Sequence, residues 1–139
     1  MISNPLNGWC DFKLGTFTGM PSYITDVPCD LLDAFISYHK TGSGVAYFDE
    51  EGTGFTLVLT PASIFIISEK EKTELYDFSD MSIKDIEIEL LEDIKYNINQ
   101  WVNFTVAFTK DEFIKYEKQI QEKIKTLSKL VGGTLWRKN

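Results

Sequence analysis

The chain has 139 residues, of which 43% are hydrophobic and 14% aromatic, and its formal net charge is −7 at pH 7. This size and composition predict one globular domain spanning residues 1–139 and exclude an intrinsically disordered chain. The charge is unevenly divided: residues 1–109 hold 17 Asp and Glu against 6 Lys, whereas residues 110–139 hold 8 Lys and Arg against 4 Asp and Glu. Because the acidic part repels phosphate groups, we expect no direct binding to nucleic acid or to anionic membranes.

The N-terminal sequence predicts a cytoplasmic protein. Residues 1–5 contain no positively charged side chain and no apolar run of the kind that begins a secretory signal. The longest apolar stretches, such as residues 64–67, are far shorter than the ~20 residues that a membrane helix requires. In that compartment we expect Cys10 and Cys29 to be reduced, partly buried thiols rather than a disulfide.

The first part of the chain predicts short strands followed by a helix. Residues 9–24 contain alternating and aromatic apolar positions interrupted by glycines, which indicates one or two short strands. Residues 28–40 predict the first helix, because Pro28 suits the first helical position and an apolar stripe follows at spacings of three and four. Asp26 or Val27 is the expected cap of this helix.

The middle of the chain predicts an antiparallel meander. Four runs rich in β-branched and aromatic residues are joined by short polar connections, which indicates that consecutive strands are neighbours. These runs are Val45–Phe48, Phe55–Thr60, Ser63–Ser68 and Glu74–Phe78. In the second and third runs both alternating faces are apolar, so we expect these strands to be covered at least partly on both sides.

The last third of the chain predicts two helices. The first begins at Ser82, and its apolar stripe continues to Trp101. Residues 109–112 form a capping box for the final helix, whose stripe includes Ile114 or Tyr116 and which two glycines at 132–133 terminate. The predicted fold class is therefore α+β: an antiparallel meander sheet of four to six strands with one early helix and two C-terminal helices.

The sequence contains no recognisable catalytic or metal-binding motif. The single histidine, His39, falls at the end of the first helix, where the helix dipole favours it, and we assign it no catalytic role. The carboxylates of residues 49–51 could gather a hard cation, but their spacing is not that of a calcium loop. We therefore expect neither a metal nor another cofactor.

The remaining sequence feature that could indicate a function is a set of acidic clusters. They lie around the first helix, in the loop at residues 49–51, and on the helix that follows Ser82, where Glu87, Glu89, Glu92 and Asp93 are expected beside or opposite the apolar stripe. Such an excess of negative charge attracts a cationic partner and speeds its association by about 10–10³-fold.

Three runs of sequence, Ser22–Pro28, Leu31–Phe35 and Gly44–Asp49, resemble small acidic immunity proteins of contact-dependent and other polymorphic bacterial toxin systems. The resemblance extends to size, acidity, aromatic content and α+β order over about residues 9–130. It implies a non-enzymatic inhibitor that binds one cognate toxin domain, often a basic nuclease, and blocks its active site or substrate groove.

The residues that we expect to bind this partner are acidic side chains together with two tyrosines, since tyrosine is frequent at the energetic centre of interfaces. They are Asp26, Asp30, Asp33, Asp49, Glu50, Glu51, Tyr23 and Tyr47. We expect the inhibitor to be a monomer or a weak homodimer.

Two other functions remain open from sequence. One is a small metal- or ligand-binding enzyme whose carboxylates converge in a pocket. The other is a structural protein that self-associates through exposed aromatic residues near Phe12–Phe17.

Overall fold

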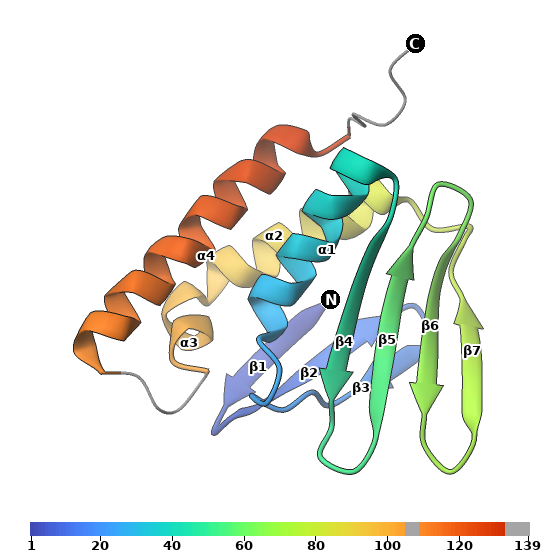
Figure 1. The fold of residues 1–139 in the computed structure, drawn as a ribbon, viewed down its shortest axis with the longest axis horizontal. Coiled ribbons are helices and arrows are strands. Elements are labelled where there is room, and N and C mark those ends of the chain that lie inside the picture. The colour runs from blue at the N-terminus through green and yellow to red at the C-terminus, as the bar shows by residue number, and fades with distance from the viewer. Residues whose placement is uncertain (105–108, 133–139) are drawn as a thin grey trace.

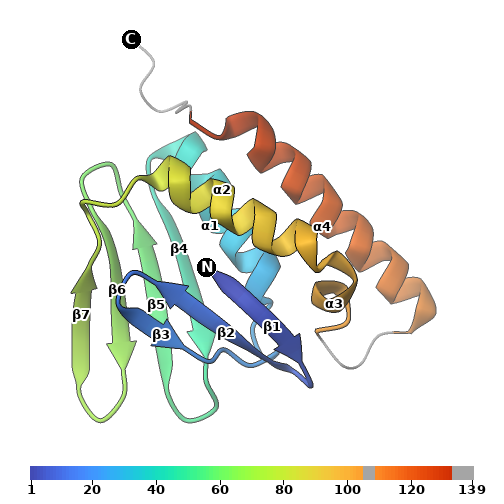
Figure 2. The same cartoon turned by 180° about the vertical axis from the view of Figure 1, so that it is seen from behind.

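The computed structural model of the chain describes residues 1–104 and 109–132. It has an α+β fold in which a three-stranded and a four-stranded antiparallel sheet lie against each other, with helices along one side (Figures 1 and 2). The predicted α+β class is therefore confirmed, although the strands form two sheets of three and four strands instead of one sheet of four to six. The final helix was predicted to end at the two glycines 132–133, and the second of these lies outside the described residues.

The first sheet is formed by β1 (Ile2–Leu6), β2 (Trp9–Leu14) and β3 (Phe17–Gly19), in that order. The last two strands are those predicted within residues 9–24. The first strand was not predicted, because its sequence Ile-Ser-Asn-Pro-Leu holds residue types that are depleted in strands. A turn with positive φ at Asn7 (54°) and Gly8 (78°) joins it to β2.

The second sheet is the predicted meander. Its strands are β4 (Gly44–Asp49), β5 (Gly54–Leu59), β6 (Ile64–Glu69) and β7 (Thr73–Asp77), each paired antiparallel with the next. Every connection between them is a short hairpin, which keeps neighbours in sequence adjacent in the sheet.

Aromatic side chains join the two sheets. The Phe12 ring of β2 lies 5.9 Å from Phe48 and 4.9 Å from Phe55, and Phe17 also lies 4.9 Å from Phe55. Phe12 is only 1% exposed and Phe17 only 3%. The expectation that aromatic residues near Phe12–Phe17 are exposed for self-association is therefore wrong, because these rings fill the space between the sheets.

The first helix, α1 (Val27–Thr41), begins as predicted and packs against β4 and the last helix. Asp26 is its cap, and Pro28 lies in its first turn. A Cβ atom added to Gly44 would lie 1.9 Å from the backbone oxygen of Ala34, so only glycine permits β4 to approach the helix this closely.

The C-terminal helices differ from the prediction in one respect. The helix predicted over residues 82–101 is divided at Asn97 into α2 (Ile83–Tyr96) and the short α3 (Ile98–Val102). The final helix, α4 (Lys110–Leu130), begins at its predicted cap, and Tyr116 rather than Ile114 takes the buried position.

Candidate protein-binding surface

Two of the three acidic residues predicted around α1 are held by contacts with α4. The Asp26 carboxylate accepts hydrogen bonds from the Cys29 backbone N–H (3.3 Å) and from the Tyr116 hydroxyl (2.5 Å). The Asp33 carboxylate pairs with Lys123, with 2.6 Å between Oδ1 and Nζ. Asp26 and Asp33 therefore take part in the contact between α1 and α4. Their negative charge is partly offset by Lys123, which belongs to the basic C-terminal segment.

Asp30, the third acidic residue of this group, is half-buried between the other two. Burial is the main cause that raises the pKa of its carboxyl from 3.8 to about 6, and the negative charges of Asp26 and Asp33 add to the shift. Lys123 opposes the shift but does not cancel it. A carboxyl in this position is less suited to remain charged than one at an open surface.

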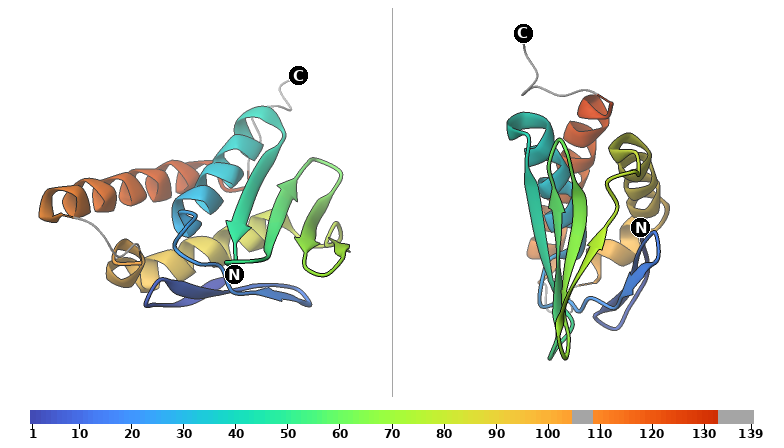
Figure 3. Two further views of the ribbon diagram at one scale, coloured as in Figure 1. Left: turned by 60° about the horizontal axis from the view of Figure 1, so that its bottom comes forward. Right: turned by 90° about the vertical axis from the view of Figure 1, so that its right-hand side faces the viewer.

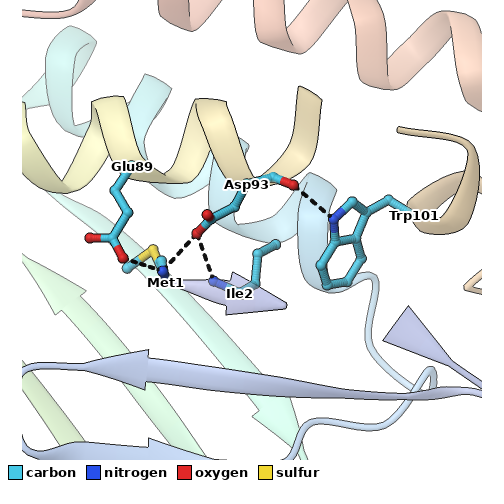
Figure 4. A network of polar contacts seen from close by, with 5 residues as sticks. All are labelled: Met1, Ile2, Glu89, Asp93 and Trp101. Atoms are coloured by element: carbon cyan, nitrogen blue, oxygen red, sulfur yellow. Dashed lines mark hydrogen bonds and ion pairs between the residues drawn. The ribbon is translucent and has the colours of Figure 1, made fainter. Parts of the chain in front are cut away.

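The acidic residues of α2 are also partly used within the molecule, as Figure 4 shows. The α-amino group of Met1 donates to Glu89 Oε1 (2.6 Å) and to Asp93 Oδ2 (2.7 Å). Asp93 also accepts the backbone N–H of Ile2 (3.1 Å), and its backbone oxygen accepts the indole N–H of Trp101 (3.3 Å). These contacts fix β1 and α3 to α2.

The expectation that the acidic side chains of α2 lie at the surface is wrong for Glu87. It is fully buried, and its Oε1 atom contacts Nε2 of His39, which is also buried at the end of α1. Burial raises the pKa of Glu87, and His39 opposes that shift. The signal that could have placed Glu87 inside is its spacing, four residues after Ile83 and three before Leu90, which puts it on the apolar stripe.

The acidic loop at residues 49–51 forms the hairpin tip between β4 and β5. Asp49 Oδ1 accepts the Glu51 backbone N–H (2.6 Å). Glu50 Oε2 accepts the Met20 backbone N–H (2.9 Å), and its Oε1 accepts the Thr53 hydroxyl (3.3 Å). Within residues 1–104 and 109–132, none of these three carboxylates forms an ion pair with a lysine.

Of the two tyrosines chosen from sequence, Tyr47 lies beside this hairpin tip, and Tyr23 is linked to it only through the backbone of its neighbour. The Tyr47 ring lies over Gly54, where an added Cβ would be 2.4 Å from the Tyr47 hydroxyl oxygen. Partial desolvation and the nearby charges of Asp49, Glu69 and Glu50 raise the pKa of Tyr47. The segment that contains Tyr23 is tied to the hairpin, because the backbone N–H of its neighbour Ser22 donates to the Asp49 carbonyl (2.8 Å).

The structure therefore gathers Tyr47 and the acidic residues 49–51 at one end of the second sheet, whereas the Tyr23 ring lies over Gly8 in the turn between β1 and β2. It does not bring Asp30 and Asp33 to the same place, because both lie on α1 beside α4. Of the eight residues predicted from sequence, four are exposed, namely Tyr23, Asp33, Tyr47 and Glu51, and the other four are half-buried.

Beyond the hairpin tip, one face of β4–β7 is left uncovered by the described helices and strands, as the edge-on view in Figure 3 shows. Cross-strand register places its side chains in three rows, which we call the outer face. The rows are Val45–Val58–Phe65–Asp77, Tyr47–Thr56–Ile67–Leu75 and Asp49–Gly54–Glu69–Thr73. The two central strands were expected to be covered at least partly on both sides. Their inner-face side chains are buried and the apolar ones on the outer face are half-buried, although the helices and the first sheet pack only on the inner face.

A groove of about 640 Å³ lies against the first sheet and is open to solvent. Its charged lining consists of two carboxylates, Asp11 and Glu50, and two lysines, Lys13 and Lys70. In the described part of the chain, no group of three or more His, Cys, Asp or Glu side chains is arranged to hold a metal ion. Cys10 and Cys29 are both buried free thiols, as expected.

Among the helices that the structure describes, none has both the length and the apolar character needed to span a membrane. Comparison of the chain with protein-family models, with curated proteins and with solved structures found no match.

Proposed function

We propose that the protein is a non-enzymatic immunity protein that binds and neutralises a cationic bacterial toxin domain, such as a nuclease. One observation supports this proposal above the others: Asp49, Glu50 and Glu51 are consecutive at one hairpin tip, and none of their carboxylates has a lysine partner among the described residues. The basic residues of α4 lie elsewhere, and one of them, Lys123, already pairs with Asp33.

The physical basis of this proposal is electrostatic attraction between the carboxylates and a basic partner. Carboxylates that are not offset within the molecule create a negative potential that attracts a positively charged surface and orients it before contact. Tyr47 lies next to these carboxylates and is 44% exposed, so aromatic area is available where the charges would guide a partner. Charge and aromatic area together are typical of a protein interface whose partner is basic.

Immunity proteins of the kind that this chain resembles are encoded beside their toxins, so the test is co-expression of the chain with the product of the adjacent upstream gene. We expect the two proteins to co-purify, and we expect cells that produce the toxin domain to grow only when this chain is present. The association rate should fall steeply when NaCl is raised from about 50 mM to about 500 mM, because salt screens the attraction. Absence of both binding and protection would contradict the proposal.

A second candidate function is a small ligand- or metal-binding enzyme. The groove of about 640 Å³ beside the first sheet favours it, because Asp11 and Glu50 both line that groove. A thermal-shift screen with divalent cations and small polar ligands tests this function, since a ligand at 100-fold its Kd adds about 2.7 kcal/mol of stability. A rise in melting temperature that Glu50→Gln abolishes would favour the enzyme over the inhibitor.

A further inference from the structure

We infer that the outer face of β4–β7 is the surface on which the cationic protein partner docks. This inference rests on the proposed function and specifies it, because it adds an apolar contact area to the acidic hairpin tip. None of the apolar residues of this face other than Tyr47 was predicted from sequence to bind a partner.

The first step of the argument is the chemistry of the outer face. Six of its side chains are apolar or aromatic and lie in two adjoining rows: Val45, Tyr47, Val58, Phe65, Ile67 and Leu75. Exposure is greatest on the two outermost strands, where Val45 is 61% and Leu75 is 67% exposed. Contiguous apolar surface of this kind is unusual on a protein that acts alone and marks sites of interaction.

The second step is the charge at the margin of this apolar area. Asp49 and Glu69 lie in one end row of the outer face, and Asp77 lies at the opposite corner. No lysine or arginine is among the twelve residues of the face. Lys70, in the hairpin between β6 and β7, lines the groove beside the first sheet together with Glu50.

An apolar centre with an acidic margin is complementary to a partner that has an apolar patch bordered by lysine or arginine. The same charges argue against a second copy of this chain as the molecule that covers the outer face. An isologous dimer through this face would bring two sets of carboxylates together, and each chain has a net charge of −7. The occupant that fits the surface is therefore a basic protein domain.

The experiment compares variants of the full chain for binding to the product of the adjacent upstream gene. Val45→Ser and Leu75→Ser are combined to remove the most exposed apolar side chains of the outer face. The matched control is Ile114→Ser, which removes a 56% exposed apolar side chain from α4, far from this face. All three positions are exposed, so urea unfolding should show folded proteins of similar stability.

We expect the double variant to bind at least about tenfold more weakly than the wild type, while Ile114→Ser binds as the wild type does. Equal binding by the wild type and the double variant would overturn the docking surface and leave the proposed function standing. Absence of binding by the wild type would overturn the proposed function, and the inference would fall with it.

Two further measurements test other occupants of the outer face. Sedimentation velocity should show a monomer at concentrations where the partner binds; a dimer that the double variant dissociates would mean that a second copy covers the face. Removal of residues 133–139 should leave hydrogen exchange in β4–β7 unchanged. Faster exchange in those strands would mean that the chain covers its own outer face, and either result would overturn the inference.

Discussion

Replacement of Asp30 by Asn is expected to stabilise the folded protein near neutral pH. Asp30 lies in the first turn of α1, half-buried beside Asp26 and Asp33. Burial first, and then the charges of these two neighbours, raises its pKa from 3.8 to about 6. The variant keeps the shape of the side chain and removes the charge that this environment disfavours.

The direction of the pH dependence follows from the raised pKa. Between pH 3.8 and about 6 the folded protein holds the Asp30 proton more tightly than the unfolded chain does. The free energy of unfolding should therefore fall as the pH rises through this window. A pKa shift of this size corresponds to at most about 3 kcal/mol, and solvent screening of a half-buried group reduces the expected effect to about 1 kcal/mol.

The assay is urea unfolding followed by tryptophan fluorescence at about pH 4, 6 and 7.5. Asp30→Asn should raise the free energy of unfolding by about 1 kcal/mol at the highest pH and change it little at the lowest. The matched control is Asp111→Asn, an exposed acid in the first turn of α4. The control should lower stability slightly, by about 0.3–1 kcal/mol, because a negative charge there suits the helix dipole.

A lower stability of Asp30→Asn at about pH 7.5, or a pH dependence equal to that of the wild type, would refute this reasoning. The first result would mean that the folded protein favours the charged form of Asp30, and the second that folding does not change the pKa of this carboxyl.

Three further predictions concern the hairpin tip, the thiols and the contact between β4 and α1. Glu51→Lys should slow association with the product of the adjacent upstream gene, as measured by stopped-flow kinetics, and should weaken the salt dependence of the association rate. The matched control, Glu92→Lys on α2, makes the same charge change and should have a smaller effect. Cys10 and Cys29, whose pKa values burial raises to about 12, should react with a thiol reagent at about pH 8 only after unfolding, and rapid reaction of the native protein would contradict their burial. Gly44→Ala should lower the free energy of unfolding by about 3 kcal/mol or more, because the added carbon meets the backbone of α1, and an unchanged urea midpoint would show that the strand can move away.

The elements that the sequence predicted well are those with strong local signals. The strands of the meander were recognised because alternating β-branched residues are separated by short polar turns. The caps at Asp26, Ser82 and Thr109 were recognised because each supplies an oxygen to a free backbone N–H. The break at Asn97 was missed, since the apolar stripe continues past it in the sequence.

The candidate site was only partly predictable, because tertiary contacts decide which acidic residues remain available. Sequence alone could not distinguish Asp33, which pairs with Lys123 ninety residues away, from Asp49, which has no such partner in the described residues. The outer face was missed for a related reason. A strand with apolar residues on both faces suggests burial on both sides, whereas here one apolar side carries no layer of described helices or strands and is only half-buried.

The contact between His39 and Glu87 restricts how the sequence of this protein can diverge. A change at either position alone leaves a buried polar group facing an apolar side chain, which folding does not tolerate well. The two positions are therefore expected to change together during evolution, as a matched polar pair or a matched apolar pair. Such paired substitutions between α1 and α2 would identify distant relatives even after the partner-facing side chains have altered beyond recognition.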